Sequence, residues 1–124
     1  MRTLRLHLRY DGTDFFGWQI QPGRRTIQGE LERALAVILD GPVRASAAGR
    51  TDRGAHAVGQ VASLTTGRRI PPDSLRRGLN SLLPPDIHVD ALGEAPPGFH
   101  ASSQTMVFLP RFVTTACIST MNLQ

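Results

Sequence analysis

The 124-residue chain contains no lysine, so all 14 of its basic residues are arginines, set against 10 acidic residues for a net charge of +4. Arginine presents a planar fork of donors that matches phosphates and base edges. The charge balance therefore favours an acidic polymer as partner. A GC-rich coding bias, which replaces lysine by arginine on any surface, explains the same absence, and charge alone does not choose between the two.

Cysteine and long apolar runs are also scarce. A single cysteine, Cys117, excludes an internal disulfide framework and a Cys-based zinc site. No apolar stretch approaches the roughly 20 residues of a membrane helix, and the first ten residues alternate charge and leucine, unlike a signal peptide. We expect a soluble, cytoplasmic protein with no membrane partner. Its four histidines are too scattered for a metal-ligand spacing, so we expect no metal: His7, His56, His88 and His100.

Hydrophobic periodicity predicts four strands and two helices in the first 100 residues. Alternating leucines mark a half-buried strand at 2–10, and Thr26 can cap a helix whose apolar residues recur at helical spacing. The predicted elements are, in order, a strand at 2–10, a helix from Thr26 that ends at Gly41-Pro42, strands at 43–48 and 55–64, a helix opened by Pro71 and ended by Pro84, and a strand at 86–92.

This order of elements is the split β-α-β-β-α-β arrangement of ferredoxin-like and RRM-like domains. The predicted fold class is α+β, an antiparallel sheet with both helices on one face. The other face of the sheet is then free, as in modules that lay RNA across it.

The last quarter of the chain departs from this pattern. Residues 101–124 carry one charge, Arg111, together with the only cysteine and two of the three methionines. We expect a domain at 1–101 followed by a divergent tail at 102–124 that is frameshifted or disordered. The alternative is an ordinary apolar strand at about 106–113, interrupted by Pro110.

The most unusual stretch for chemistry lies between the two middle strands. Gly49 and Gly54 bracket a tight loop in which Asp52 is flanked by Arg50 and Arg53. A carboxylate near guanidinium groups is favoured in its ionised form, and on a loop it can act as nucleophile or base. The arginines can hold phosphates or take the place of a displaced base. The alternative is a surface salt bridge that contributes less than about 1 kcal/mol.

The stretch from Gly49 to Ala57 (GRTDRGAHA) resembles the G-R-T-D-x-G-V/A-H-A signature of the TruA family of tRNA pseudouridine synthases. Five further stretches resemble motifs of that family in the same order, so a chance resemblance is excluded. They are Tyr10 to Gln19, Thr26 to Glu32, Gly59 to Val61, Asn80 to Ile87, and Phe99 to Ala101.

The resemblance implies an isomerase that converts uridines of the tRNA anticodon arm to pseudouridine, without metal or organic cofactor, as a homodimer that binds tRNA. Asp52 would be the essential aspartate, attacking the sugar or assisting proton removal; both remain open. Arg50 would occupy the space left by the flipped uridine and orient the carboxylate. Base flipping costs a few kcal/mol of unstacking, which an inserted side chain helps to offset.

Other residues are weaker candidates for RNA contacts. Arg53 is a phosphate contact or a solvated charge, and Arg24 and Arg25 are phosphate contacts or an idle surface pair. His56 is expected to support the loop through a hydrogen bond, with general-base chemistry as the alternative. Aromatic side chains in the loop after the first strand can stack on bases, but packing against the protein is favoured: Phe15, Phe16 and Trp18.

Beyond Ala101 the sequence departs from the family, which continues with an R-x-Y-x-Y strand whose tyrosine faces the aspartate, and then with a second domain. The only tyrosine here is Tyr10. The sequence therefore predicts a truncated tRNA pseudouridine synthase. The alternative function is that of a catalytically silent RNA-binding remnant of such an enzyme.

Overall fold

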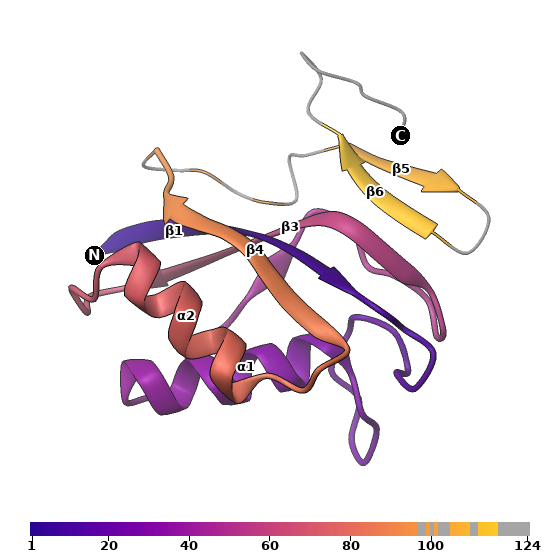
Figure 1. Ribbon diagram of the computed structural model, residues 1–124, viewed down its shortest axis with the longest axis horizontal. Coiled ribbons are helices and arrows are strands. Elements are labelled where there is room, and N and C mark those ends of the chain that lie inside the picture. Colours follow the sequence, from indigo (N-terminus) through magenta and orange to yellow (C-terminus); the bar gives the residue numbers. More distant parts are fainter. Residues whose placement is uncertain (97–98, 100, 102–104, 110–111, 117–124) are drawn as a thin grey trace.

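The fold is an α+β sheet of the predicted split arrangement, seen in a computed structural model (Figure 1). The structure describes residues 1–96, 99, 101, 105–109 and 112–116. Its elements are β1 (Arg2–Tyr10), α1 (Ile27–Leu39), β2 (Ser46–Ala47), β3 (His56–Thr66), α2 (Pro72–Leu82), β4 (Ile87–Glu94), β5 (Thr105–Leu109) and β6 (Phe112–Ala116).

The sheet is built around β1, which lies between β3 and β4 and pairs with both in antiparallel register. The outer edge of β3 is shared: β2 pairs with Ala62 and Ser63, and β6 runs parallel to β3 from His56 to Val58. β5 pairs with β6 and completes the order β4-β1-β3-β6-β5.

Two strands, β5 and β6, lie within the predicted tail, where the alternative interpretation placed a single strand at 106–113. The rest of that tail, residues 102–104, 110–111 and 117–124, lies outside the described residues.

The first helix begins and ends as its capping residues predict. The Thr26 hydroxyl accepts a hydrogen bond from the Gly29 backbone N–H at 3.2 Å, which satisfies one of the free donors of the first turn. At the other end Asp40 adopts a left-handed conformation with φ 55° and donates its backbone N–H to Ala36. The prediction that Thr26 caps this helix is confirmed.

The strand predicted at 43–48 is too long, because β2 covers only Ser46–Ala47. Two side chains of α1 bond to the backbone of Ala45, the residue before β2. Gln28 donates to the Ala45 carbonyl at 3.0 Å, and Glu32 accepts from the Ala45 N–H at 2.9 Å. With both groups bonded to the helix, that residue cannot pair with a neighbouring strand.

The core fills the space between the sheet and the two helices, which lie on one face (Figure 1). Fully burying one leucine side chain stabilises a fold by roughly 1.5–3 kcal/mol. Completely buried leucines come from one side of β1 and from the inner faces of both helices: Leu4, Leu6, Leu8, Leu31, Leu35, Leu75 and Leu79. No helix in the described part of the chain is long and apolar enough to cross a bilayer.

On the opposite face of the sheet, β1 and β4 carry charged side chains. Arg9 and His88 both contact the Asp90 carboxylate, at 2.9 Å each. Near the middle of this face the Arg5 guanidinium lies 5.6 Å from the Phe99 ring centre. Burial, and secondarily the charge of Arg5, lower the pKa of His7 on the same face. RNA modules that read bases on a sheet use exposed aromatics, and the residues of β1 and β4 on this face supply none.

A candidate active-site loop at one end of the sheet

Residues 48–55 form the loop between β2 and β3, and they rest on the loop that follows β1. The Trp18 N–H donates to the Thr51 carbonyl at 3.0 Å, and the Gly54 N–H donates to the Phe15 carbonyl at 3.2 Å. Gly17 lies at the contact with φ 85°, and a Cβ added there would come within 2.6 Å of the Thr51 oxygen. The close approach of the two loops therefore requires glycine at this position.

A buried hydrogen-bond network lies beneath this loop. The Tyr10 hydroxyl contacts the Thr51 hydroxyl at 2.7 Å, and the Gln60 side-chain amide donates to the Tyr10 oxygen at 3.3 Å and to the Gly49 carbonyl at 2.8 Å. Tyr10, Thr51 and Gln60 are at most 5% exposed. Burial raises the pKa of Tyr10, an effect that its hydrogen bonds to Thr51 and Gln60 partly oppose. The network fixes the backbone immediately before Asp52.

Asp52 lies on the outer side of a tight turn, with its carbonyl accepting the Ala55 N–H at 3.0 Å and Gly54 at φ 80°. The residue is exposed, as are Arg50 and Arg53. Within the described residues, the Asp52 carboxylate forms no hydrogen bond and no ion pair, so neither flanking guanidinium is paired with it. The arrangement presents an open carboxylate to solvent from a braced backbone.

Two of the candidate arginines pack against the same aromatic ring. The guanidinium carbons of Arg53 and Arg24 lie 4.5 and 4.7 Å from the ring centre of Phe16. Cation–π contacts at exposed sites contribute about 0.5–1 kcal/mol each, and they leave the N–H donors free for other partners. Arg24 and Arg53 therefore lie together beside the Asp52 turn, both exposed.

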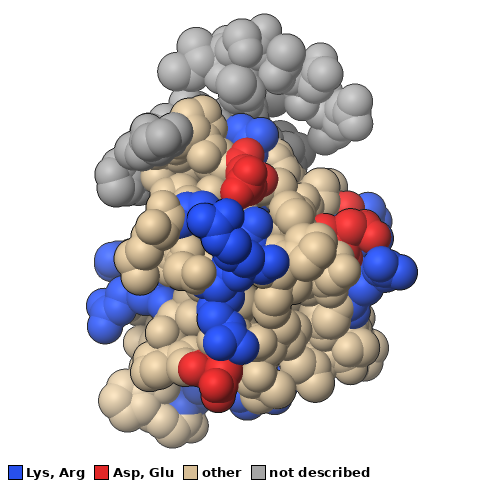
Figure 2. Space-filling model, turned by 90° about the vertical axis from the view of Figure 1, so that its left-hand side faces the viewer, with Lys and Arg blue, Asp and Glu red and all other residues tan. Residues whose placement is uncertain are grey.

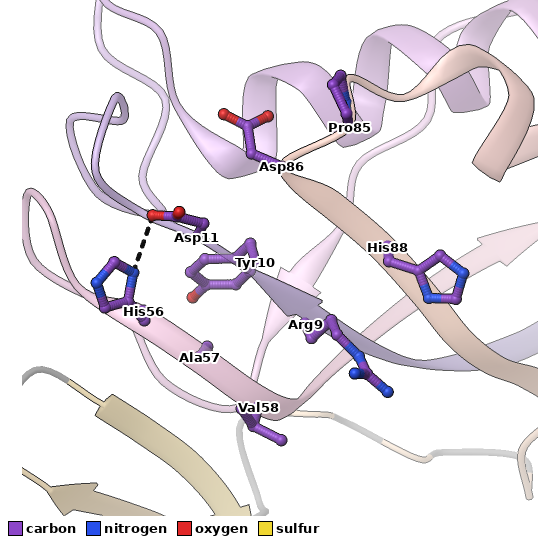
Figure 3. Close-up of a pocket in the computed structure, with 9 residues that line it drawn as sticks. All are labelled: Arg9, Tyr10, Asp11, His56, Ala57, Val58, Pro85, Asp86 and His88. Carbon is purple, nitrogen blue, oxygen red and sulfur yellow. Dashed lines mark ion pairs between the residues drawn. The ribbon is translucent and has the colours of Figure 1, made fainter.

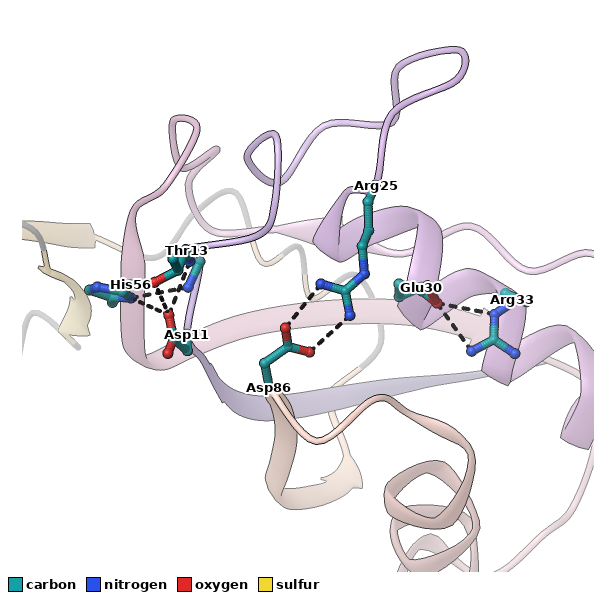
Figure 4. A network of polar contacts seen from close by, with 8 residues as sticks. Asp11, Thr13, Arg25, Glu30, Arg33, His56 and Asp86 are labelled. Carbon is teal, nitrogen blue, oxygen red and sulfur yellow. Dashed lines mark hydrogen bonds and ion pairs between the residues drawn. The ribbon is translucent and has the colours of Figure 1, made fainter.

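Arg25 is engaged in the structure instead. Its guanidinium makes a bidentate pair with the Asp86 carboxylate at 3.0 and 3.1 Å and lies 4.0 Å from the ring centre of Phe15 (Figure 4). The hydrogen bond to Asp86 raises the pKa of Arg25. This pair ties the loop after β1 to the start of β4. Phe15 and Trp18 are buried, which confirms that these aromatics pack against the protein.

His56, the first residue of β3, bonds the loop that follows β1. Its Nδ1 lies 3.1 Å from both the Gly12 backbone N–H nitrogen and the Asp11 carboxylate (Figure 4). An unprotonated Nδ1 accepts from Gly12, whereas a protonated one donates to Asp11. Hydrogen bonds from the Thr13 hydroxyl and backbone N–H lower the pKa of Asp11. A Cβ on Gly12 would lie 1.9 Å from the Ala55 oxygen, so here too the two loops touch.

A cavity of about 400 Å³ opens beside His56, where β1 ends and β3 and β4 begin (Figure 3). Arg9, Tyr10 and His88 also line it. A second hollow of about 470 Å³ is lined by Thr13, Arg53 and residues 54–56. Asp52 lines neither, while His56 lines both. In the part of the chain that the structure describes, no group of three acidic, histidine or cysteine residues could hold a metal ion.

Comparison with known proteins assigns the family of this domain. Residues 7–102 match the family model of tRNA pseudouridine synthase. The chain belongs to the tRNA pseudouridine synthase family, as the resemblance of its motifs implied.

Proteins similar to this chain are also described as tRNA pseudouridine synthases. The chain is 50% identical over 115 residues to tRNA pseudouridine synthase A of Geobacter sulfurreducens, covering 93% of this chain and 43% of that protein. It is 50% identical over 101 residues to the protein of the same name from a Geobacillus species, covering 81% and 41%. The chain thus spans less than half the length of the relatives it matches.

Sequence reasoning missed the buried network of Tyr10, Thr51 and Gln60. Its members lie within motifs that carried the family resemblance, but spacing along the chain does not say which of their side chains meet. A signal was present in Gln60, a polar residue among apolar neighbours in the middle of a strand. A buried amide of this kind requires partners.

Proposed function

We propose that this chain is the N-terminal part of an enzyme that converts uridine to pseudouridine in the anticodon arm of tRNA, with Asp52 as its catalytic residue. One observation carries the proposal: an exposed carboxylate, unpaired among the described residues, stands on a turn. The backbone before it is held by hydrogen bonds from Tyr10 and Gln60. Preorganised groups of this kind are what catalysis on a positioned substrate requires. The proposed location is the cytoplasm, where such a tRNA is available.

The reaction is an isomerisation. The C1′–N1 bond breaks, the base turns, a bond forms between C1′ and C5, and the C5 proton is released as N1 regains one. Asp52 either attacks C1′ or removes the proton, and the open position of its carboxylate supports both roles. Arg50, exposed two residues earlier, would enter the space of the extruded uridine.

The exposed pair Arg24 and Arg53 would hold phosphates near the target nucleotide. Arg25 and His56 are proposed as supports of the RNA-facing loops, because both are bonded to neighbouring residues. A homodimer is proposed with tRNA as its partner.

A catalytically silent RNA-binding remnant is the second candidate. A specific observation favours it: the only tyrosine, Tyr10, is 4% exposed and hydrogen-bonded inside the domain. It therefore cannot serve as the tyrosine that faces the aspartate in the family.

Tritium release from tRNA labelled at C5 of uridine separates the two candidates. We expect the chain to release tritium, and Asp52→Asn to abolish the release. Salt-sensitive binding of tRNA without any release supports the remnant and contradicts the enzyme.

We further propose that the family domain ends near residue 101 and that residues 102–124 diverge from it. The family match ends at residue 102, which supports this boundary, whereas the alignment with the Geobacter sulfurreducens protein covers 115 residues and extends past it. Translation of the coding DNA past codon 101 in the other two frames tests it. Recovery of an arginine- and tyrosine-rich strand followed by a second domain is the expected result, and its absence from both frames contradicts a frameshift.

A further inference from the structure

The positive charge of this domain lies mainly at the end of the sheet opposite to Asp52. Around the Asp52 end, five arginines are matched by five aspartates: Arg9, Arg24, Arg25, Arg50 and Arg53 against Asp11, Asp14, Asp52, Asp86 and Asp90. At the opposite end six arginines face only three acidic residues: Arg2, Arg44, Arg68, Arg69, Arg76 and Arg77 against Asp40, Asp73 and Glu94.

The contacts of β1 place these arginines together. Arg2 pairs with Thr66 across the sheet, and its guanidinium donates to the carbonyls of Arg68, at 3.1 Å, and Ile70. It also lies 3.5 Å from the Glu94 carboxylate. Arg2 is therefore a brace that holds the loop between β3 and α2 against the sheet. Figure 2, which views the side of the molecule that carries the N-terminus, shows basic side chains in a vertical band down its centre, with acidic side chains above and below the band.

Most of the remaining charge at this end is not neutralised. Arg76 and Arg77 share one carboxylate, that of Asp73, at 3.0 and 3.2 Å. Arg44, Arg68 and Arg69 are exposed, and their side chains form no ion pair within the described residues. Arg44 joins them at this end, since it lines a hollow of about 500 Å³ together with Thr3 and Thr65.

The chemistry of this surface fits a polyphosphate rather than a protein. Guanidinium groups bind phosphate oxygens through bidentate, charge-assisted hydrogen bonds. Protein interfaces are anchored by buried apolar side chains, yet residues 67–77 expose no large hydrophobic side chain. The exposed hydrophobics near this end are Met1 and Val37, which are isolated from each other in sequence. Strands rise about 3.3 Å per residue, so the two ends of β1 are on the order of 25 Å apart.

We propose that Arg44, Arg68, Arg69, Arg76 and Arg77 form a distal arginine surface that binds backbone phosphates of the same RNA whose uridine reaches Asp52. The proposal rests on the proposed function, because it takes RNA as the substrate. It adds that the affinity comes mainly from an end of the domain remote from the chemistry. The RNA must then be a structured one long enough to contact both ends.

The test measures binding of the full chain to a tRNA transcript at several salt concentrations. The variants are Arg69→Gln, the double variant Arg68→Gln/Arg69→Gln, and Arg33→Gln as matched control. Arg33 is an exposed arginine of α1 outside the distal surface. Its replacement removes one positive charge, as Arg69→Gln does, but leaves the distal surface intact. Each lost phosphate contact should lower the salt slope by about one and the affinity about tenfold near 0.1 M salt.

We expect Arg69→Gln to weaken binding about tenfold, the double variant about a hundredfold, and Arg33→Gln less than threefold. Binding by the distal variants equal to wild type overturns the proposal, as does an equal loss in Arg33→Gln, which would show an effect of net charge alone. Failure of the wild-type chain to bind tRNA overturns it as well. Binding that depends on the distal surface without tritium release keeps this proposal and rejects only the catalytic one.

Discussion

At the scale of single residues, the position of the Asp52 carboxylate depends on how the backbone before it is held. The Tyr10 hydroxyl bonds Thr51 and Gln60, and Gln60 also bonds Gly49, so both ends of the stretch 49–51 are tied to the sheet. The two bonds of the Tyr10 hydroxyl are buried and the bond to Gly49 is partly buried. An unsatisfied buried partner costs about 1–3 kcal/mol.

Removal of the Tyr10 hydroxyl tests this network. Tyr10→Phe should lower the free energy of unfolding by about 1–2 kcal/mol, because Thr51 and Gln60 each lose a buried partner. It should also lower turnover while leaving tRNA affinity within about twofold. Urea denaturation and tritium release check the two effects. Thr51→Val should behave like Tyr10→Phe, whereas Thr51→Ser keeps the hydroxyl and should retain turnover; equal loss in Thr51→Ser would contradict the network.

His7 predicts a pH dependence of stability. Its pKa is lowered in the folded protein by burial and by Arg5, against a smaller opposing effect of Asp90. The unfolded chain therefore binds a proton more readily, so this contribution to stability is complete above about pH 6.5 and declines as the pH falls toward the folded-state pKa. The melting temperature should drop between pH 7 and 5, and less so in His7→Gln. An identical drop in that variant would assign the effect to other groups.

At the scale of elements, local signals predicted what local chemistry controls. Thr26 begins α1 and the alternating leucines define β1, because caps and periodicity act within a few residues. The short β2 could not be predicted, since Gln28 and Glu32 reach it from a helix more than ten residues away in sequence. The pairing of β6 with β3 is equally non-local.

The Arg25–Asp86 pair is a contact between elements, and its contribution to the free energy of unfolding can be measured by mutation. Arg25→Gln should lower the free energy of unfolding by about 1–2 kcal/mol, because it removes a bidentate pair and the contact with Phe15. Arg33→Gln is the matched control; its partner Glu30 is one helical turn away, and such a pair contributes less than about 0.5 kcal/mol. Equal urea midpoints for both variants would contradict a special role of the Arg25 pair.

At the scale of the whole molecule, the sheet separates two tasks. One end carries the open Asp52 carboxylate on a nearly charge-balanced surface, and the other carries the excess of arginine. The sequence motifs alone predicted the functional residues at the Asp52 end. The other end could not be predicted, since arginines from the loop after α1, the loop between β3 and α2, and α2 itself gather only when the sheet aligns them.

The catalytic role of Asp52 is tested by comparing Asp52→Asn with Asp14→Asn for both turnover and tRNA affinity. Both aspartates are exposed and lie in the two contacting loops, so the lost charge is the same. If the Asp52 carboxylate performs the chemistry, Asp52→Asn loses at least about a thousandfold in turnover, or roughly 4 kcal/mol of transition-state stabilisation, with affinity unchanged, and Asp14→Asn stays within tenfold of wild type. Turnover in Asp52→Asn within tenfold of the wild-type chain would contradict the account.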